Sequence, residues 1–387
     1  MAMPMPAADE QYEIIIVGGG PAGLATALHL QQRFPALAAR TLILEAAQHP
    51  RRKICGGAVT AHGEAQLAAL GLRVDVPAVT VDRVRFRYRR HAFTLHAPAA
   101  MRVVQRDAFD GALAAAAQAR GLALRCGEAV CGVQVMPGGV ALRTSHAAYH
   151  ARVVVAADGA NSTVRRALGL RAPIGVARLL RVMTPVDPAK PEFAGRAATF
   201  DFSCVAHGIQ GYAWDFPCLL DGRPCFNRGI FDSRLHGAPR GDLKAVLARG
   251  LDERGIAPDG VRLEGHPVRW FNPRAAFAAP HVLLAGDAAG VDPLFAEGIS
   301  YALEYGAVAA DAIGAAYARG DWSFADYRAR LLRHDLGRML AWKYALARWL
   351  YGRRPGLLWG LVWRLAVVAP AWMQRRVGRA LGVLPLA

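Results

Sequence analysis

The feature that most constrains the fold is a glycine-rich turn near the start of the chain. An apolar, strand-like stretch runs into the pattern Gly18-x-Gly20-Pro21-Ala22-Gly23, and an alanine- and leucine-rich helical pattern follows at once. Glycines at these spacings allow a tight turn, let the backbone approach a pyrophosphate and pack the helix on the strand. We therefore predict a strand, a phosphate-binding turn and a helix that together hold a dinucleotide.

A second apolar stretch, residues 41–44, supports this prediction because it ends on a carboxylate, Glu45. In dinucleotide-binding folds an acidic residue roughly 20 residues after the glycines binds ribose hydroxyls. The N-terminus of the first helix adds free N–H groups for the phosphates. We expect Glu45 to bind the adenosine ribose.

Composition indicates a globular protein of more than one domain that carries excess positive charge. The chain has 387 residues, 53% of them hydrophobic, and 47 Lys plus Arg against 30 Asp plus Glu. A net charge of +17 suits nucleic acid, an anionic membrane surface or an anionic cofactor, but no nucleic-acid module is visible. The six cysteines have neither zinc-site spacing nor the density of a disulfide scaffold, so we expect a reducing cytoplasm and no metal.

Two later loops also follow apolar strands. Residues 152–157 lead to Asp158-Gly159, and residues 281–285 lead to Gly286-Asp287. The region between them is rich in aromatic and turn residues, which predicts a mostly antiparallel sheet that covers the nucleotide. Alternating residues 84–88 and 92–96 predict a hairpin.

These patterns predict an α/β fold in which a nucleotide-binding domain is interrupted by a second domain. The expected parts are a disordered lead (1–11), a discontinuous nucleotide-binding domain (12–170 and 271–320), an inserted, mostly antiparallel substrate-binding sheet (171–270) and a C-terminal helical region (321–387).

The order and setting of the three loops resemble the para-hydroxybenzoate hydroxylase-like flavoprotein superfamily. The resemblance implies a Rossmann-like domain of the glutathione reductase type that binds FAD. It places Asp158 near the pyrophosphate and Asp287 against the ribityl or ribose part of FAD, with Gly286 in the same turn.

Further motifs resemble the geranylgeranyl reductase family over roughly residues 13–310. The motifs are Lys53-x-Cys55-Gly56-Gly57, Gly211-Tyr212-x-Trp214-x-Phe216-Pro217, and Pro293-x-x-x-Glu297-Gly298-Ile299 after Gly286-Asp287. The resemblance implies hydride transfer from reduced FAD to an isoprenoid double bond. It places the Cys-Gly-Gly loop beside the flavin, Gly298 and Ile299 over it, and the aromatic segment around the substrate.

Several candidate residues keep two interpretations at this stage. Cys55, beside a basic run, either donates a proton or positions the substrate, or is simply packed. Lys53 either contacts the FAD pyrophosphate or is a solvated surface charge. Arg106 reaches the FAD phosphate or ribose by resemblance. Tyr212 and Trp214 face one side of a strand together with Phe216, which suits either an aromatic wall beside substrate and flavin or an ordinary core.

The C-terminal region interleaves five of the eight tryptophans with arginines, a pattern that suits a lipid interface. The apolar run 357–373 is interrupted by Arg364 and Pro370 and falls short of the roughly 20 residues that span a bilayer. Two alternatives remain open: helices lying on the inner face of the membrane, or a helical subdomain packed on its own protein.

We therefore expect an FAD-dependent oxidoreductase of the geranylgeranyl reductase type that reduces double bonds in a prenyl or lipid-like substrate. NAD(P)H, ferredoxin or a quinone pool would supply its electrons. The alternatives are an FAD-dependent aromatic or polyene monooxygenase and a flavin-binding electron carrier. A halogenase is disfavoured, because Tyr212-Ala-Trp214-Asp-Phe216-Pro217 stands where that family has Trp-x-Trp-x-Ile-Pro.

Overall fold

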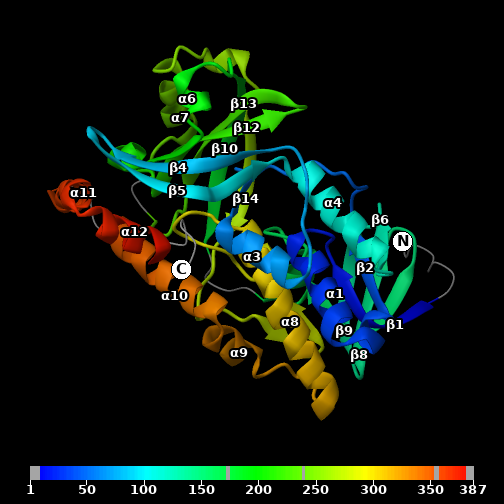
Figure 1. The fold of residues 1–387 in the computed structure, drawn as a ribbon. Coiled ribbons are helices and arrows are strands. Elements are labelled where there is room, and N and C mark those ends of the chain that lie inside the picture. The colour runs from blue at the N-terminus through cyan, green and yellow to red at the C-terminus, as the bar shows by residue number, and fades with distance from the viewer. Residues whose placement is uncertain (1–8, 171–174, 238–239, 353–356, 381–387) are drawn as a thin grey trace.

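The fold consists of two eight-stranded sheets with helices packed around the first and a helical C-terminal region along one side (Figure 1). The computed structural model describes residues 9–170, 175–237, 240–352 and 357–380. The predicted α/β class, with a Rossmann-like domain, a second sheet and C-terminal helices, is confirmed.

The first sheet has a parallel centre. Its order is β15-β16-β9-β1-β2-β6, the pairs from β16 to β6 are parallel, and the antiparallel strands β8 and β7 extend it from β9. The strands are β1 (Asp9–Val17), β2 (Thr41–Glu45), β6 (Ala123–Cys126), β7 (Val130–Met136), β8 (Gly139–Thr144), β9 (Ala148–Ala156), β15 (Ala278–Ala279) and β16 (Val282–Leu284). Helices cover the parallel strands, so these read as continuous apolar runs, such as the fully buried Ile14 to Ile16.

The helices of this domain surround the sheet and the loops at its ends. They are α1 (Pro21–Arg33), α2 (Pro35–Ala38), α3 (Ala61–Ala69), α4 (Arg106–Ala119), α5 (Thr163–Ala167) and α8 (Ile299–Arg319). Helix α8 lies directly on α1, and a Cβ atom at Gly306 would stand only 2.6 Å from the Cβ of Ala25. The glycine therefore lets α1 and α8, which lie far apart in the sequence, approach each other closely.

The second sheet is antiparallel except for one parallel pair, β11 with β4, and its order is β14-β10-β13-β12-β11-β4-β5-β3. The strands are β3 (Ala58–Thr60), β4 (Ala78–Tyr88), β5 (His91–Val104), β10 (Val176–Pro185), β11 (Ala197–Asp201), β12 (Gly211–Leu220), β13 (Arg223–Asp232) and β14 (Glu264–Arg269). Helix α6 (Pro191–Ala194) lies between β10 and β11 in the chain, and α7 (Leu243–Asp252) lies between β13 and β14.

Strands β3 to β5 lie within the range 12–170 that the sequence analysis assigned to the nucleotide-binding domain, yet they pair in the second sheet. The alternating side chains of β4 explain this placement. Val84, Phe86 and Tyr88 are buried, and Phe86 stacks on Phe200 of β11 with 5.5 Å between ring centroids. The hairpin thus shares the aromatic core of the second sheet, a contact between segments far apart in the sequence.

The prediction that residues 1–11 are disordered is wrong for its last three residues. Asp9 to Gln11 belong to β1 and pair with residues 148–150 of β9, because the strand continues as far as β9 can accept its hydrogen bonds. Residues 1–8 lie outside the described residues.

In its described residues, the C-terminal region forms the helices α9 (Tyr327–Arg333), α10 (Asp335–Tyr351), α11 (Leu357–Val368) and α12 (Ala371–Ala380). Trp359 and Trp363 of α11 are buried, and they lie 5.6 and 5.8 Å from the ring of Tyr88. For these two tryptophans, packing on the protein is the correct alternative. Arg353, Arg354 and residues 381–387 fall outside the described part of the chain, within which no helix combines the length and the apolar character needed to cross a bilayer.

Helix α1 contains a histidine that should make the fold sensitive to acid. His29 is 1% exposed, and neither ring nitrogen has a hydrogen-bond partner among the described residues. Burial, helped by the nearby charge of Arg33, lowers the pKa of His29 to about 4, against about 6.5 in an unfolded chain. The neutral ring therefore contributes stability that is complete above pH 6.5 and is lost as the pH falls towards 4.

We expect the free energy of unfolding of the His29→Leu variant to change less between pH 7 and pH 4 than that of the wild type, by up to about 3 kcal/mol. Urea denaturation at several pH values measures this difference. His207→Leu, at an exposed position, is the matched control and should keep the wild-type pH dependence. Parallel pH curves for wild type and His29→Leu would contradict the assignment.

Candidate active site

The glycine turn at the end of β1 has a shape that only glycine permits. Gly18 has φ +111°, and a Cβ atom there would lie 2.3 Å from the carbonyl oxygen of Ala157. A Cβ atom at Gly23 would lie 1.9 Å from the oxygen of Gly18. The backbone therefore passes close to the end of β9, and α1 then begins at Pro21. The N–H groups of the first helical turn lie at this glycine turn and are available to a phosphate.

Glu45 closes the other side of this turn at the end of β2. Its carboxylate accepts hydrogen bonds from the N–H groups of Gly19 (2.8 Å) and Ala47 (3.0 Å). Arg51 lies 3.3 Å from the same carboxylate and 3.2 Å from Asp110. The sequence analysis did not single out Arg51, whose guanidinium lies over Gly20, where an anionic ligand would meet it.

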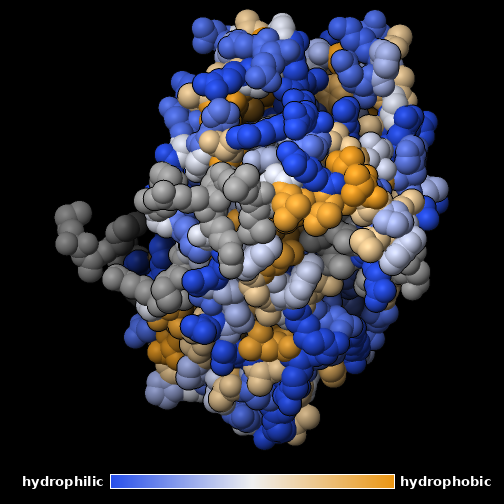
Figure 2. All heavy atoms as spheres, turned by 90° about the vertical axis from the view of Figure 1, so that its left-hand side faces the viewer, coloured by the Kyte–Doolittle hydropathy of each residue, from blue (hydrophilic) through white to orange (hydrophobic). Residues whose placement is uncertain are grey.

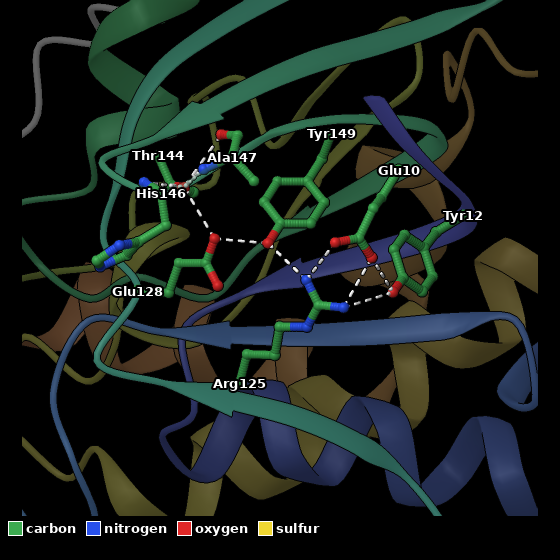
Figure 3. A network of polar contacts seen from close by, with 8 residues as sticks. All are labelled: Glu10, Tyr12, Arg125, Glu128, Thr144, His146, Ala147 and Tyr149. Carbon is green, nitrogen blue, oxygen red and sulfur yellow. Dashed lines mark hydrogen bonds and ion pairs between the residues drawn. The ribbon is translucent and has the colours of Figure 1, made fainter. Parts of the chain in front are cut away.

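A polar network that is buried at Glu128, Thr144 and Tyr149 and partly exposed at Glu10 and Arg125 supports the loop next to Glu45 (Figure 3). Glu128 lines the same cavity, and its carboxylate accepts hydrogen bonds from Tyr149 (2.5 Å) and Thr144 (2.8 Å). Arg125 donates to Tyr149 and, through two nitrogens, to Glu10 at 2.7 Å. The network joins β1, β6, β8 and β9, and so holds the nucleotide side of the cavity to the sheet.

The two carboxylate oxygens of Asp158 differ in their hydrogen bonding among the described residues. The first oxygen accepts from the N–H groups of Thr163 (2.7 Å) and Val164 (3.1 Å) at the start of α5. The second is buried, and no hydrogen-bond partner for it occurs among the residues described. Burial raises the pKa of Asp158. An unpartnered buried oxygen in a cavity wall is what a ligand hydroxyl or phosphate-bound water would satisfy.

The Gly286-Asp287 loop packs directly on the glycine turn. A Cβ atom at Gly286, where φ is +59°, would lie 2.7 Å from the Cβ of Ala22. Asp287 lines the cavity beside Gly298. The three loops therefore converge on one cavity, and their close-approach glycines, carboxylates and helix N-terminus fit a dinucleotide such as FAD.

The Cys-Gly-Gly loop is held by two residues that the sequence analysis did not identify. Asn227 of β13 donates through its amide nitrogen to the carbonyl oxygens of Cys55 (2.8 Å) and Gly56 (3.0 Å). Arg181 of β10 donates to the Cys55 oxygen as well (3.1 Å) and forms a buried ion pair with Glu264. The second sheet therefore positions this loop through the backbone of Cys55.

The Cys55 side chain opens to the cavity and faces a buried cation. Its sulfur accepts a hydrogen bond from the N–H of Gly57 at 3.4 Å. Arg106 is fixed by Asp110 through two hydrogen bonds of 2.8 Å. Burial alone would lower the pKa of Arg106, but Asp110 raises it overall, so the guanidinium stays charged in the wall of the cavity that Cys55 also lines.

Lys53 lies in the cavity wall against a histidine from β14. Its ammonium nitrogen is 2.6 Å from Nε2 of His266, so the neutral imidazole accepts the hydrogen bond. Burial lowers the pKa of Lys53. Burial, followed by the charge of Lys53, lowers the pKa of His266 to about 4. The pair presents one positive charge to the cavity. Nothing in the sequence around residue 266 had indicated that His266 would contact Lys53.

Tyr212, Trp214 and Phe216 lie on one face of β12, as their alternation predicts, and each is only 4% exposed. They line the cavity together with Phe200, Phe231 and Phe295. Trp214 donates its indole N–H to the side-chain oxygen of Asn227 at 3.1 Å, and Tyr212 donates to the carbonyl of Phe295. The aromatic face is therefore both a packed core and a cavity wall.

One continuous cavity of about 450 Å³ joins these parts. Its lining runs from the glycine turn and Glu45, past Lys53 and Cys55, to the aromatic wall and the segment 291–299, which includes Gly298 and Ile299. The structure thus brings the predicted site residues together around one cavity, except that Gly23 and Gly286 pack against Gly18 and Ala22 of the turn and do not line it. The cavity has a polar end for a nucleotide and an apolar end for a second molecule.

Comparisons with known proteins agree with this geometry. A family model described as an FAD binding domain matches residues 11–200. A menaquinone reductase from Mycolicibacterium smegmatis is 28% identical over 347 residues, covering 77% of this chain and 75% of the relative. A digeranylgeranylglycerophospholipid reductase from Thermoplasma acidophilum is 27% identical over 342 residues, covering 81% of each.

A solved structure shows the same fold. The crystal structure of a geranylgeranyl bacteriochlorophyll reductase-like protein from Thermoplasma acidophilum superimposes with a TM-score of 0.74. The two chains are 24% identical, and the match covers 89% of this chain and 88% of the other.

Proposed function

Because this chain belongs to the geranylgeranyl reductase family within the para-hydroxybenzoate hydroxylase-like FAD-dependent oxidoreductases, we propose that it saturates carbon–carbon double bonds of a prenyl or similarly lipid-like substrate. The observation that carries the proposal is the aromatic end of the cavity, which continues directly from the nucleotide end. A cavity wall made of aromatic side chains favours a hydrocarbon chain over a polar substrate.

The balance of the proposed reaction is one hydride and one proton added across the double bond. Reduced FAD, when bound, would supply the hydride to one alkene carbon. Gly18, Glu45, Arg51, Asp158 and Asp287 would hold it. NAD(P)H, reduced ferredoxin or a quinol would then restore the reduced cofactor.

The protein's own residues would orient the alkene, exclude water and provide the proton. Tyr212, Trp214 and Phe216 form a dry wall along which a hydrocarbon chain can lie. The Cys55 thiol opens to the same cavity and is the proposed proton donor, with the positive charge of Arg106 stabilising the thiolate that remains. Solvent would then reprotonate the thiolate.

Anaerobic reoxidation of the reduced flavoprotein tests this proposal. We expect a geranylgeranyl compound to restore the oxidised flavin absorption without oxygen, and the saturated analogue to leave the flavin reduced. Reduced flavin that persists until air enters, and then forms a long-lived hydroperoxide, would instead indicate a monooxygenase. Reoxidation by electron acceptors alone, with no alkene or aromatic product, would indicate an electron carrier.

We also propose that helices α10 to α12 rest on an anionic membrane surface, which would supply the substrate. Exposed apolar side chains gather on the face that bears these helices (Figure 2); they are Trp342, Trp349, Leu361, Val362, Leu365, Val368, Trp372 and Met373. The exposed arginines 364, 375 and 376 lie among them, a combination that suits anionic headgroups.

Co-sedimentation with vesicles tests the membrane proposal. We expect binding to vesicles that contain an anionic lipid and much weaker binding to zwitterionic ones, with the difference reduced at high salt. The double variant Leu365→Glu/Val368→Glu should bind at least about tenfold less. Equal binding of this variant and the wild type would contradict the proposal.

A further inference from the structure

A buried lysine of the C-terminal region contacts a residue that lines the cavity. Lys343 lies on α10 and is fully buried. Its ammonium nitrogen is 2.8 Å from a carboxylate oxygen of Asp292 and 3.5 Å from one of Glu297. The rings of Tyr301 and Phe295 stand at 4.9 and 5.7 Å, which adds favourable cation–π contacts.

The two carboxylates have different tasks in the segment 291–298. Asp292 is fully buried, and its other oxygen accepts from the N–H groups of Leu294 (2.7 Å) and Phe295 (3.2 Å), so it shapes the turn. Glu297 lines the cavity, and its other oxygen accepts a hydrogen bond from Thr60 on β3 at 2.7 Å. Lys343 therefore ties α10 to the turn and to a side chain that borders the substrate space.

The charges in this group do not cancel. Two carboxylates and one ammonium leave a net charge of −1 in a buried region. A buried ionised group is stable only where partners compensate its lost hydration. Burial alone would lower the pKa of Lys343, but Asp292, Tyr301 and Glu297 raise it, so the lysine remains charged and keeps both carboxylates in place.

We propose that Lys343 is a positioning residue for alkene reduction, because it fixes Glu297 and the segment 291–298 against the substrate end of the cavity. The proposal rests on the proposed function and adds that helix α10 is part of the site. A purely structural role would require only that the net charge of the group stay at −1. A positioning role requires in addition that Glu297 be held by the ammonium itself.

A charge-matched double variant separates these two roles. Lys343→Met alone would leave two buried carboxylates without a cation and is at risk of unfolding. Lys343→Met/Asp292→Asn leaves Glu297 as the one carboxylate of the group, with the same net charge of −1. The asparagine oxygen can still accept from the N–H groups of Leu294 and Phe295, so the turn is retained.

We expect the double variant to melt near the wild-type temperature and to bind FAD normally. Its kcat for alkene-dependent flavin reoxidation should fall at least about tenfold with little change in KM, since small misplacements in a site are costly. In FAD-free protein, amide hydrogen exchange over residues 291–298 should accelerate. Arg338→Met, at an exposed position of the same helix, is the control and should match the wild type in every measurement.

A wild-type kcat in a stable double variant would overturn the proposal, because Lys343 would then serve only to keep the net charge of the group at −1. Unchanged exchange over residues 291–298 would overturn it as well. If the wild type itself shows no reoxidation by alkenes, the proposed function fails. The exchange measurement then still decides whether Lys343 orders this segment.

Discussion

Replacing Gly18 by alanine is expected to abolish FAD binding while leaving most of the fold intact. The residue has φ +111°, and the added Cβ would stand 2.3 Å from the carbonyl oxygen of Ala157. Backbone strain and the clash together should cost at least about 3 kcal/mol, which corresponds to a loss of affinity of about 100-fold or more. The turn must move away from β9, and the site for the pyrophosphate moves with it.

Retention of the flavin absorption after purification, and titration of FAD-free protein with FAD, measure this effect. Gly121→Ala is the matched control. Gly121 also has a positive φ of +80°, but nothing lies within 4 Å of its added Cβ. It should lose some stability and keep wild-type affinity for FAD. Normal FAD binding by Gly18→Ala would show that this turn does not hold the cofactor.

The second large effect is expected at Asn227, whose side chain couples the Cys-Gly-Gly loop to the aromatic wall. Asn227→Leu removes the donor to the Cys55 and Gly56 carbonyls and the acceptor for the Trp214 indole. Each buried group left unpaired costs about 1–3 kcal/mol. We expect alkene-dependent reoxidation to slow about 100-fold, since a displacement of about 1 Å at the reacting groups can have that effect.

Two further variants sharpen this prediction. Asn227→Asp retains the acceptor for Trp214 and loses the donor to the loop, so it should resemble Asn227→Leu if the loop is what matters. Asn272→Ala removes another buried asparagine, whose side chain accepts from the N–H of Arg274. It should leave reoxidation unchanged. Wild-type rates in Asn227→Leu, measured by stopped-flow absorption with FAD bound, would remove Asn227 from the site.

The parts of the site that the sequence predicted are those in which neighbouring residues carry the chemistry. Gly18 to Gly23 form a turn through their own backbone, so the pattern is informative without knowledge of what lies nearby. The same holds for the alternation of Tyr212 and Trp214 on one strand, where the period of two decides which side chains share a face. The fold class followed from these local patterns and from the resemblance they support.

The parts that the sequence did not predict depend on contacts between distant segments. Asn227 is an ordinary strand residue until its partner 172 positions away is known, and the link from Lys343 to Asp292 spans 51 positions. Lys343 lies in a helix whose tryptophans and arginines suggested a surface role. The burial of Trp359 and Trp363 was not predicted for the same reason, because both pack against rings of distant segments, Tyr88 in β4 and Phe202.

The pairing of β1 with β9, and of β9 with β16, has a consequence for biosynthesis. Among the described strands, β1 comes first in the chain and lies at the centre of the first sheet, yet the Asp287 side of its cavity is encoded about three quarters of the way along the 387 residues. Similarly, the aromatic face of β4 must wait for β11. A nascent chain therefore exposes apolar strands until these later segments are made, and it can complete its nucleotide site only after residue 287 has been added.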